Sequence, residues 1–147
     1  MARRYIEPTG FDQVFNGLVG GLTRLGLPLA GSRVLAVRGR SSGQWRTTPV
    51  NPLRLGGERY LVAPRGQTQW VRNLRVSGEG ELRHARRTER FRAEEVADAD
   101  KPPILRAYLK AWAWEVGRFF DGVDASSSDE RLAEIAPGFP VFRIRAH

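Results

Sequence analysis

Short apolar segments separated by glycine and proline turns fill most of the chain after residue 32, and this pattern limits the fold more than any other feature. The clearest case is the Gly56-Gly57 pair between PLRL and ERYLVAP, because two glycines between strand-forming segments predict a tight β-hairpin. Proline is poorly tolerated inside a sheet, so TPVNPLRL, with its two prolines, predicts an edge or bulged strand. The remaining predicted strands are RVLAVRG, GELRHAR, TERFRAEEV and PVFRIR.

Helical spacing of apolar residues marks the other elements. Residues Thr9–Gly26 carry an apolar stripe that Pro28 ends, and they predict an amphipathic helix within residues 1–30. TQWVRNLR predicts a short helix, and DASSSDERLAEIAPG predicts a polar loop with another short helix. Lys101–Asp121 predicts the longest helix, with Trp114 on the side opposite its apolar stripe. The residues of that stripe are Leu105, Tyr108, Leu109, Trp112, Val116, Phe119 and Phe120.

The order of these segments indicates the fold class. Six predicted strands and a few helices, without regular strand–helix alternation, favour an α+β fold built on an antiparallel, barrel-like sheet. A chain of 147 residues is most simply one domain, so we expect residues 1–147 to form a single unit.

The residue types exclude several kinds of catalysis. The chain has no cysteine, which excludes disulfides, thiolate zinc sites and cysteine nucleophiles. It has only two histidines, so a histidine-rich metal site is excluded and no metal is predicted. A Ser-His-Asp triad would depend on His84, and no serine lies in a nucleophile-elbow motif.

The positive charge is concentrated in one segment. The net charge is +8, but residues 33–92 hold 14 arginines, no lysine and 4 glutamates, a charge of +10 for this segment alone. Arginine grips phosphate or carboxylate through two hydrogen bonds, so an anionic partner is predicted here. Nucleic acid, anionic lipid and a phosphorylated cofactor all fit, and a general preference for arginine over lysine explains part of the signal.

The segment GRSSGQWRTTP begins with a polar turn. Gly43 permits the positive φ of a hairpin loop, and Ser41 and Ser42 add hydroxyl donors beside free backbone N–H groups. With Arg40 and Arg46 on either side, this turn predicts an anion-binding nest. Many surface hairpins have the same composition, so an ordinary surface turn is the alternative.

A second segment, APRGQTQW, repeats the same chemistry after a predicted strand. Gly66 would let the backbone approach a flat ligand closely, and Arg65 adds a cation. Trp70 and Asn73 follow on the short helix. The alternative is that Trp70 packs in the core and Asn73 only caps a turn.

In this order, GRSSGQWRTTPVNPLRL followed by ERYLVAPRGQTQWVRNLR resembles the deazaflavin-dependent nitroreductase family, whose members use coenzyme F420. The resemblance covers residues 33–92, and the closing PVFRIR strand agrees with it. It implies a split β-barrel with a reduced deazaflavin along its side. It also implies hydride delivery from C5 of that cofactor to an electrophilic substrate.

The resemblance also implies which residues contact the cofactor. Those expected at its phosphate and acidic tail are Arg40, Ser41, Ser42 and Arg46, with Gly43 in the same turn. Those expected at the deazaflavin ring are Thr47, Thr48, Pro49 and Val50 on one side, Ala63, Pro64, Arg65 and Gly66 on the other, and Trp70 and Asn73 behind.

Two positions depart from the family pattern. Ser41 stands where lysine is common, which removes a cation that Arg65 partly replaces. Pro64 stands where serine is usual, so the proton donor and any catalytic side chain stay unassigned. The candidates for a substrate wall are the aromatic residues Tyr108, Trp112, Trp114 and Phe119.

The predicted function is therefore an F420-dependent oxidoreductase that reduces a small quinone, enone or nitroaromatic. Two alternatives stay open: an FMN-dependent enzyme of the same fold, and a basic nucleic-acid-binding module with Trp45, Trp70 and Phe91 between its arginines. No signal peptide or bilayer-spanning run is evident, so a cytoplasmic location is expected. The N-terminal helix is compatible with peripheral membrane contact, and an exposed Trp114 with a homodimer.

Overall fold

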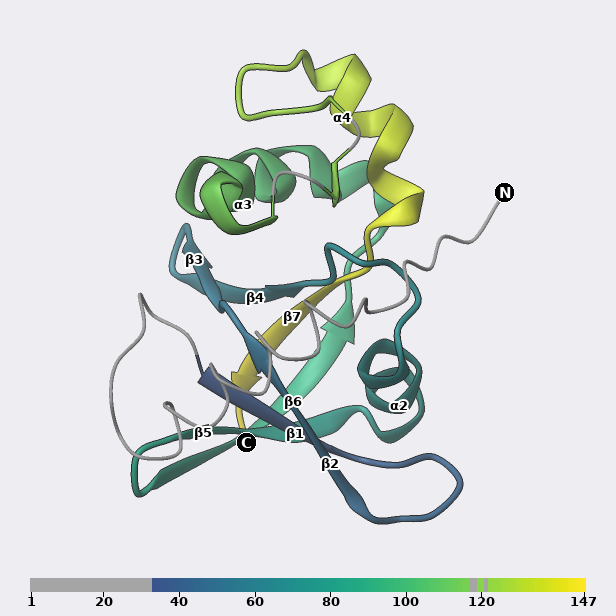
Figure 1. Ribbon diagram of the computed structural model, residues 1–147, viewed down its shortest axis with the longest axis vertical. Helices are drawn as coiled ribbons and strands as arrows, with labels where there is room; N and C mark the ends of the chain where they lie inside the picture. The colour runs from purple at the N-terminus through teal and green to yellow at the C-terminus, as the bar shows by residue number, and fades with distance from the viewer. Residues whose placement is uncertain (1–32, 117–118, 121) are drawn as a thin grey trace.

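The computed structural model describes residues 33–116, 119, 120 and 122–147, without the side chains of residues 113–116. The helix predicted within residues 1–30 therefore lies outside the described residues. The described chain forms one curled antiparallel sheet with helices on both of its faces (Figure 1). Its strands are β1 (Arg33–Arg38), β2 (Trp45–Val50), β3 (Leu53–Leu55), β4 (Glu58–Val62), β5 (Glu79–His84), β6 (Arg87–Glu95) and β7 (Val141–Ala146). Its helices are α2 (Gln69–Ser77), α3 (Lys101–Val116) and α4 (Asp129–Ile135), with short 3-10 turns at Asp98–Asp100 and Ala136–Gly138.

The strand order β2-β1-β5-β6-β7-β4-β3 places β2 and β3 at opposite edges of the sheet. The prediction of an antiparallel α+β fold is confirmed, but the sheet has seven strands and not six. The predicted strand TPVNPLRL is in fact two strands, β2 and β3, which separate at Asn51 and Pro52. Proline donates no ladder hydrogen bond, so Pro49 is tolerated in the edge strand β2, and Pro52 lies in the connection between the two strands.

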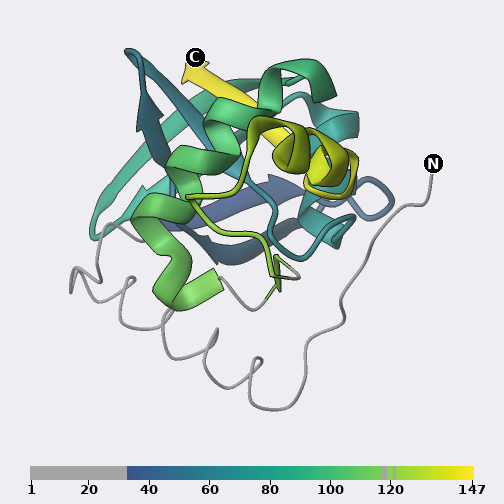
Figure 2. The same cartoon turned by 90° about the horizontal axis from the view of Figure 1, so that it is seen from above.

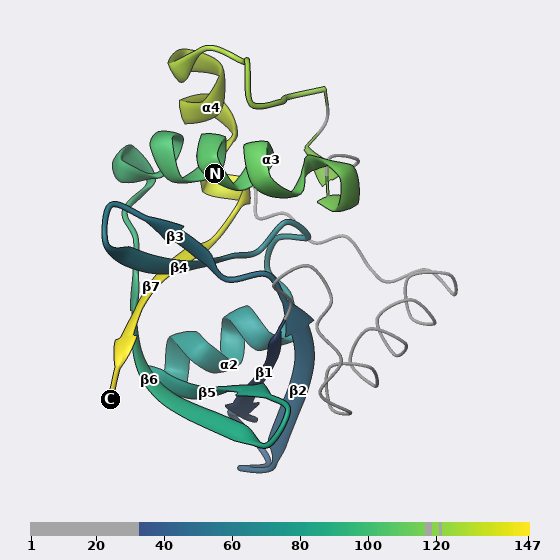
Figure 3. The same cartoon turned by 90° about the vertical axis from the view of Figure 1, so that its left-hand side faces the viewer.

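The sheet has an apolar cluster on each face, because successive side chains of a strand point to opposite sides. In β4, Tyr60 and Val62 pack with α3 and α4, whereas Leu61, together with Ala63 just after the strand, packs with α2 inside the curl. Figure 3 shows α2 enclosed by the strands, and Figure 2 shows α3 and α4 covering the opposite face. The two clusters are buried separately, one on each face of the sheet, so a binding site on one face need not involve the core of the other.

The helix α3 is shorter than predicted. The described helix covers Lys101–Val116, and Phe119 and Phe120, which the prediction included, lie outside it. Phe119 and Phe120 of the predicted stripe are nevertheless buried, and the ring of Phe120 stacks on Phe139 with centroids 4.2 Å apart. None of the helices within the described residues is long and apolar enough to cross a membrane.

Candidate functional site

The turn between β1 and β2 is closed by its own backbone. The Gly39 N–H donates to the Gln44 carbonyl at 2.8 Å, and the Gly43 N–H donates to the Gly39 carbonyl at 2.9 Å. Gly43 has a φ of 71°, as its sequence position predicts. The Ser42 hydroxyl accepts from the Gln44 N–H, while the N–H groups of Ser41 and Ser42 have no partner among the described residues. Two adjacent backbone donors are therefore free to bind an anion.

Side chains of α2 hold this turn from inside the curl. The Oδ1 atom of Asn73 accepts hydrogen bonds from the Arg40 backbone N–H at 3.1 Å and from Arg40 Nη1 at 2.8 Å. Gln69 Oε1 accepts from the same Nη1 at 2.9 Å. Asn73 is only 3% exposed, so it does more than cap a turn. The two segments that the sequence predicted separately, 33 residues apart at these contacts, therefore touch.

The bend after β4 lies at the start of α2. The Ala63 N–H donates to the Pro140 carbonyl at 2.9 Å, and the Gly66 N–H donates back to the Ala63 carbonyl at 3.2 Å. Gly66 has a φ of 84°, which only glycine adopts readily. The hydroxyl of Thr68, at the N-cap of α2, is buried and has no hydrogen-bond partner in the part of the chain that the structure describes. Sequence reasoning missed Thr68, and its position before a predicted helix would have suggested only a cap.

The edge strand β2 carries the remaining predicted contacts. Arg46 pairs in register with Val37, and Thr48 pairs with Leu35, so both point to the α2 face of the sheet. Arg46 is exposed and has no ion-pair partner among the described residues. Residues 48–50 are half-buried, and among the described residues no strand pairs with the outer edge of β2, so this edge can face a planar ligand.

The aromatic residues that we considered behind the ring or at the substrate lie in two places. Trp70 is half-buried and packs on Phe142, with ring centroids 6.0 Å apart, which fixes α2 to β7. Tyr108 is 2% exposed, and Phe119 and Trp112 pack in the same cluster on the opposite face of the sheet. The structure thus does not bring these three α3-side aromatics to the hairpin, because their apolar stripe packs against the sheet. Trp114 has a side chain outside the described part.

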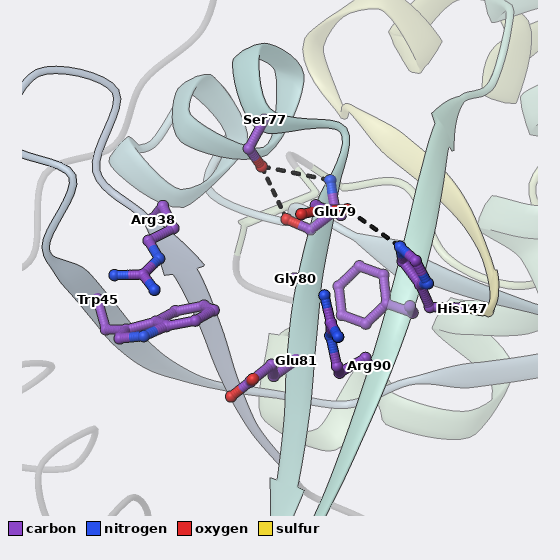
Figure 4. Close-up of a pocket in the computed structure, with 9 residues that line it drawn as sticks. Arg38, Trp45, Ser77, Glu79, Gly80, Glu81, Arg90 and His147 are labelled. Carbon is purple, nitrogen blue, oxygen red and sulfur yellow. Dashed lines mark hydrogen bonds and ion pairs between the residues drawn. The ribbon is translucent and has the colours of Figure 1, made fainter.

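A cleft of about 300 Å³ lies on the other face of the β1–β2 hairpin (Figure 4). Trp45 forms one wall, with the Arg38 guanidinium 4.2 Å from its ring centroid, and Arg90 and His147 lie across from them. His147 contacts Glu79 at 3.3 Å. Trp45 precedes Arg46 in β2, so the two side chains point to opposite faces. This cleft was not predicted, and it is separate from the hairpin–α2 junction.

Beside this cleft, Glu81 and Arg83 form an ion pair within the single strand β5. A second ion pair lies inside the curl. There, both Nη atoms of Arg59 donate to the carboxylate of Glu89. These hydrogen bonds hold the pKa of Glu89 below its usual range. Because Arg59 and Glu89 come from β4 and β6, the pair ties the two sides of β7 together.

Comparison with known proteins completes the description. Residues 10–118 match the family model described as F420H(2)-dependent quinone reductase. A structure of an F420-H2-dependent reductase is 15% identical, covers 78% of this chain and 94% of its own, and has a TM-score of 0.53. A chain described as a domain-swapped dimer is 13% identical, covers 93% of this chain and 100% of its own, and has a TM-score of 0.57.

The heme storage protein HutZ from Vibrio cholerae also has this fold, at 14% identity over 80% of this chain and 82% of its own, with a TM-score of 0.53. At such identities the likeness establishes the fold alone, and the predicted split β-barrel is confirmed. No curated protein has significant similarity to the chain.

Proposed function

Because the chain belongs to the F420H2-dependent quinone reductase family, we propose that it reduces a quinone, an enone or a nitroaromatic at the junction of the β1–β2 hairpin and α2. It is an F420-dependent oxidoreductase, and coenzyme F420 is the expected cofactor. The observation that carries the assignment to this junction is the contact of Arg40 with Asn73 and Gln69. It joins the two basic, glycine-containing segments into one surface.

The residues at the junction fit the anionic part of F420. The N–H groups of Ser41 and Ser42 and the side chain of Arg46, which have no partner within the described ranges, are suited to a phosphate, because charge-assisted donors bind oxyanions strongly. The unpartnered hydroxyl of Thr68 adds a donor or acceptor near the start of α2. The hydrogen bonds between Arg40 and Asn73 hold the turn that carries these N–H groups against α2.

The edge strand β2 and the bend after β4 fit the planar deazaflavin ring of F420. The half-buried residues 48–50 of β2 offer backbone groups and an apolar surface, and Gly66 gives the bend its positive φ. The other residues that we place around the ring are Thr47, Ala63, Pro64, Arg65 and Trp70. Reduced F420 supplies the hydride when bound, so the chain's own residues need only bind, orient and exclude water.

Binding of F420 to the purified protein tests this proposal. Trp70, one of the four tryptophans of the chain, lies on α2 at the proposed junction, so its fluorescence should be quenched by micromolar F420. Oxidation of reduced F420 should then depend on an added quinone, enone or nitroaromatic, and the class with the highest kcat/KM identifies the substrate. No quenching and no oxidation would contradict the proposal. The same titration with FMN tests the alternative cofactor.

Nucleic-acid binding is disfavoured by the placement of the aromatic residues. Phe91 is 0% exposed and Trp70 packs on Phe142, so of the three aromatics between the arginines only Trp45 is exposed for base stacking. Steep salt-dependent retention on DNA would reverse this conclusion.

We also propose a domain organisation, a membrane contact and an oligomeric state for the whole chain. We propose that residues 1–147 form one domain and that residues 1–30 are an N-terminal amphipathic helix segment in peripheral contact with a membrane. Liposome cosedimentation with and without residues 1–30 tests this contact. A homodimer is also proposed, supported by the structural neighbour described as a domain-swapped dimer, and light scattering of the purified protein tests it.

A further inference from the structure

The buried amide of Asn73 is committed to the hairpin. A single oxygen of this side chain accepts both the backbone N–H and the guanidinium Nη1 of Arg40, at 3.1 and 2.8 Å. Since Asn73 is 3% exposed, water cannot easily replace these donors. Gln69, one helical turn earlier, accepts the same Nη1 at 2.9 Å. Arg40, the first residue after Gly39, therefore connects the hairpin turn to two amide oxygens of α2.

This arrangement gives the two arginines of the hairpin different tasks. Nη1 of Arg40 is saturated by neutral acceptors of the protein, whereas Arg46 has no partner within the described residues. A guanidinium that is held in place contributes mainly geometry, and a free one contributes charge. The backbone N–H groups of Ser41 and Ser42 come directly after Arg40, so their direction depends on where Arg40 is held.

The same helix also holds the bend. Gln67 is 4% exposed, and its Oε1 accepts from Arg75 Nη1 at 2.9 Å. Arg75 in turn forms two hydrogen bonds with the carboxylate of Glu95 in β6, at 2.7 and 2.6 Å. Polar side chains at both ends of α2 thus fix the hairpin and the bend to one rigid element, which is the way a preorganised site is built.

We propose that Asn73, assisted by Gln69, is a positioning residue: it holds Arg40 so that the N–H groups of Ser41 and Ser42 converge on the cofactor phosphate, and it leaves the charge contact to Arg46. This inference rests on the proposed function. Asn73 acts before the cofactor arrives, because its hydrogen bonds exist within the protein alone. Its loss therefore weakens binding by loosening the hairpin and leaves the charge of the site unchanged.

Hydrogen exchange of the cofactor-free protein tests the first part. Asn73→Ala removes the acceptor, so the hydrogen-bonded amides of the turn, those of Arg40, Gly43 and Gln44, should exchange roughly tenfold faster, as expected for one or two lost hydrogen bonds. Asn73→Asp keeps the acceptor and should restore protection. Val76→Ala, at a 69% exposed position of the same helix, is the matched control and should change nothing. If Asn73→Ala does not fold, Gln69→Ala removes one bond at an exposed position and should show a smaller increase.

F420 binding tests the second part. Asn73→Ala should raise the KM for F420 about tenfold with little change in kcat, and it should keep the wild-type dependence of Kd on salt. Arg46→Ala should instead reduce that salt dependence, because it removes a charge that faces the phosphate. Unchanged exchange in Asn73→Ala, or faster exchange with unchanged F420 affinity, would overturn the positioning role. A wild-type protein that does not bind F420 would overturn the proposed function and this role with it, while the exchange experiment would still show whether Asn73 holds the hairpin.

Discussion

The two ends of the curled sheet are held together by different interactions (Figure 1). Where α3 and α4 cover the sheet, packing of aromatic side chains stabilises the structure: Phe120 is fully buried and stacks on Phe139. At the β1–β2 hairpin, residues 40–46 are exposed, and Asn73 and Gln69 hold the turn through hydrogen bonds.

This difference separates stability from binding. Burial of large apolar side chains contributes several kcal/mol each, whereas a hydrogen bond contributes about 1 kcal/mol but fixes direction. The α3–α4 end should therefore decide whether the protein folds, and the hairpin end whether it binds its cofactor. Each prediction below tests this separation.

The largest expected effect is that of Phe120→Ala. Its ring lies between Phe139 and Tyr108, so its removal leaves a cavity and should lower the free energy of unfolding by about 3–5 kcal/mol. Urea denaturation measures this loss, and Val76→Ala, exposed on α2, should stay within about 0.5 kcal/mol of wild type. The fraction of Phe120→Ala that is folded should bind F420 normally. A folded variant with weak binding would show that the two ends are coupled.

The next effect is that of Arg46→Ala on binding. A hydrogen bond to a charged group contributes about 1.5–3 kcal/mol, so the Kd for F420 should rise about 10- to 100-fold. The free energy of unfolding should not change, since Arg46 is exposed and has no ion-pair partner among the described residues. Arg54→Ala, an exposed arginine on the opposite edge strand, is the control for general loss of positive charge. Equal losses of affinity in both variants would contradict a specific site at the hairpin.

The elements at both ends could be predicted from local sequence, because hairpins and short helices depend on neighbours in the chain. Gly56-Gly57 and Gly43 indicated turns from the need for positive φ, and both predictions are confirmed. The division of TPVNPLRL into two strands could not be predicted, because it depends on β2 and β3 lying at opposite edges of the sheet. The α3 stripe was recognised as apolar, but whether it would line a site or a core depended on which sheet face it meets.

The two binding segments could be proposed from composition, but their contact could not. Arg40 and Asn73 are 33 residues apart, and they meet only because the strands between them curl around α2. The task of Asn73 is therefore a property of the tertiary structure. The same holds for the unpartnered hydroxyl of Thr68, whose burial depends on the packing around the N-cap of α2.

A pair of glycine substitutions compares two hairpins directly. Gly43 and Gly56 have φ values of 71° and 60°, and no atom lies within 4 Å of an added Cβ at either position. Alanine at each should therefore cost only the left-handed backbone conformation, about 1 kcal/mol of stability in denaturant unfolding. Gly43→Ala should also raise the Kd for F420 several-fold, and Gly56→Ala should leave it unchanged. Similar affinities in the two variants would mean that the geometry of the 39–44 turn does not matter for binding.

The smallest expected effect lies in the sheet between the two ends, at the ion pair of Arg59 and Glu89. The hydrogen bonds from Arg59 lower the pKa of Glu89 in the folded protein relative to its unfolded value of about 4.3. The unfolded state therefore binds a proton first as the pH falls, so the contribution of the pair is complete above about pH 5 and is lost as the pH falls through the folded pKa. Because the side chain of Glu89 is 42% exposed, solvent screening limits this contribution to about 0.5 kcal/mol.

Urea unfolding of wild type and Glu89→Gln across this acidic range measures the contribution. The two proteins should differ by about 0.5 kcal/mol near neutral pH and converge as the carboxylate is protonated. Glu94→Gln is the matched control, because Glu94 is 73% exposed and lies 3.4 Å from Arg143. F420 affinity should be the same in all three proteins at neutral pH, since the pair contacts neither the hairpin turn nor the bend. A loss of affinity in Glu89→Gln would show that the inside of the curl transmits strain to the hairpin, and stability and binding would then not be separable.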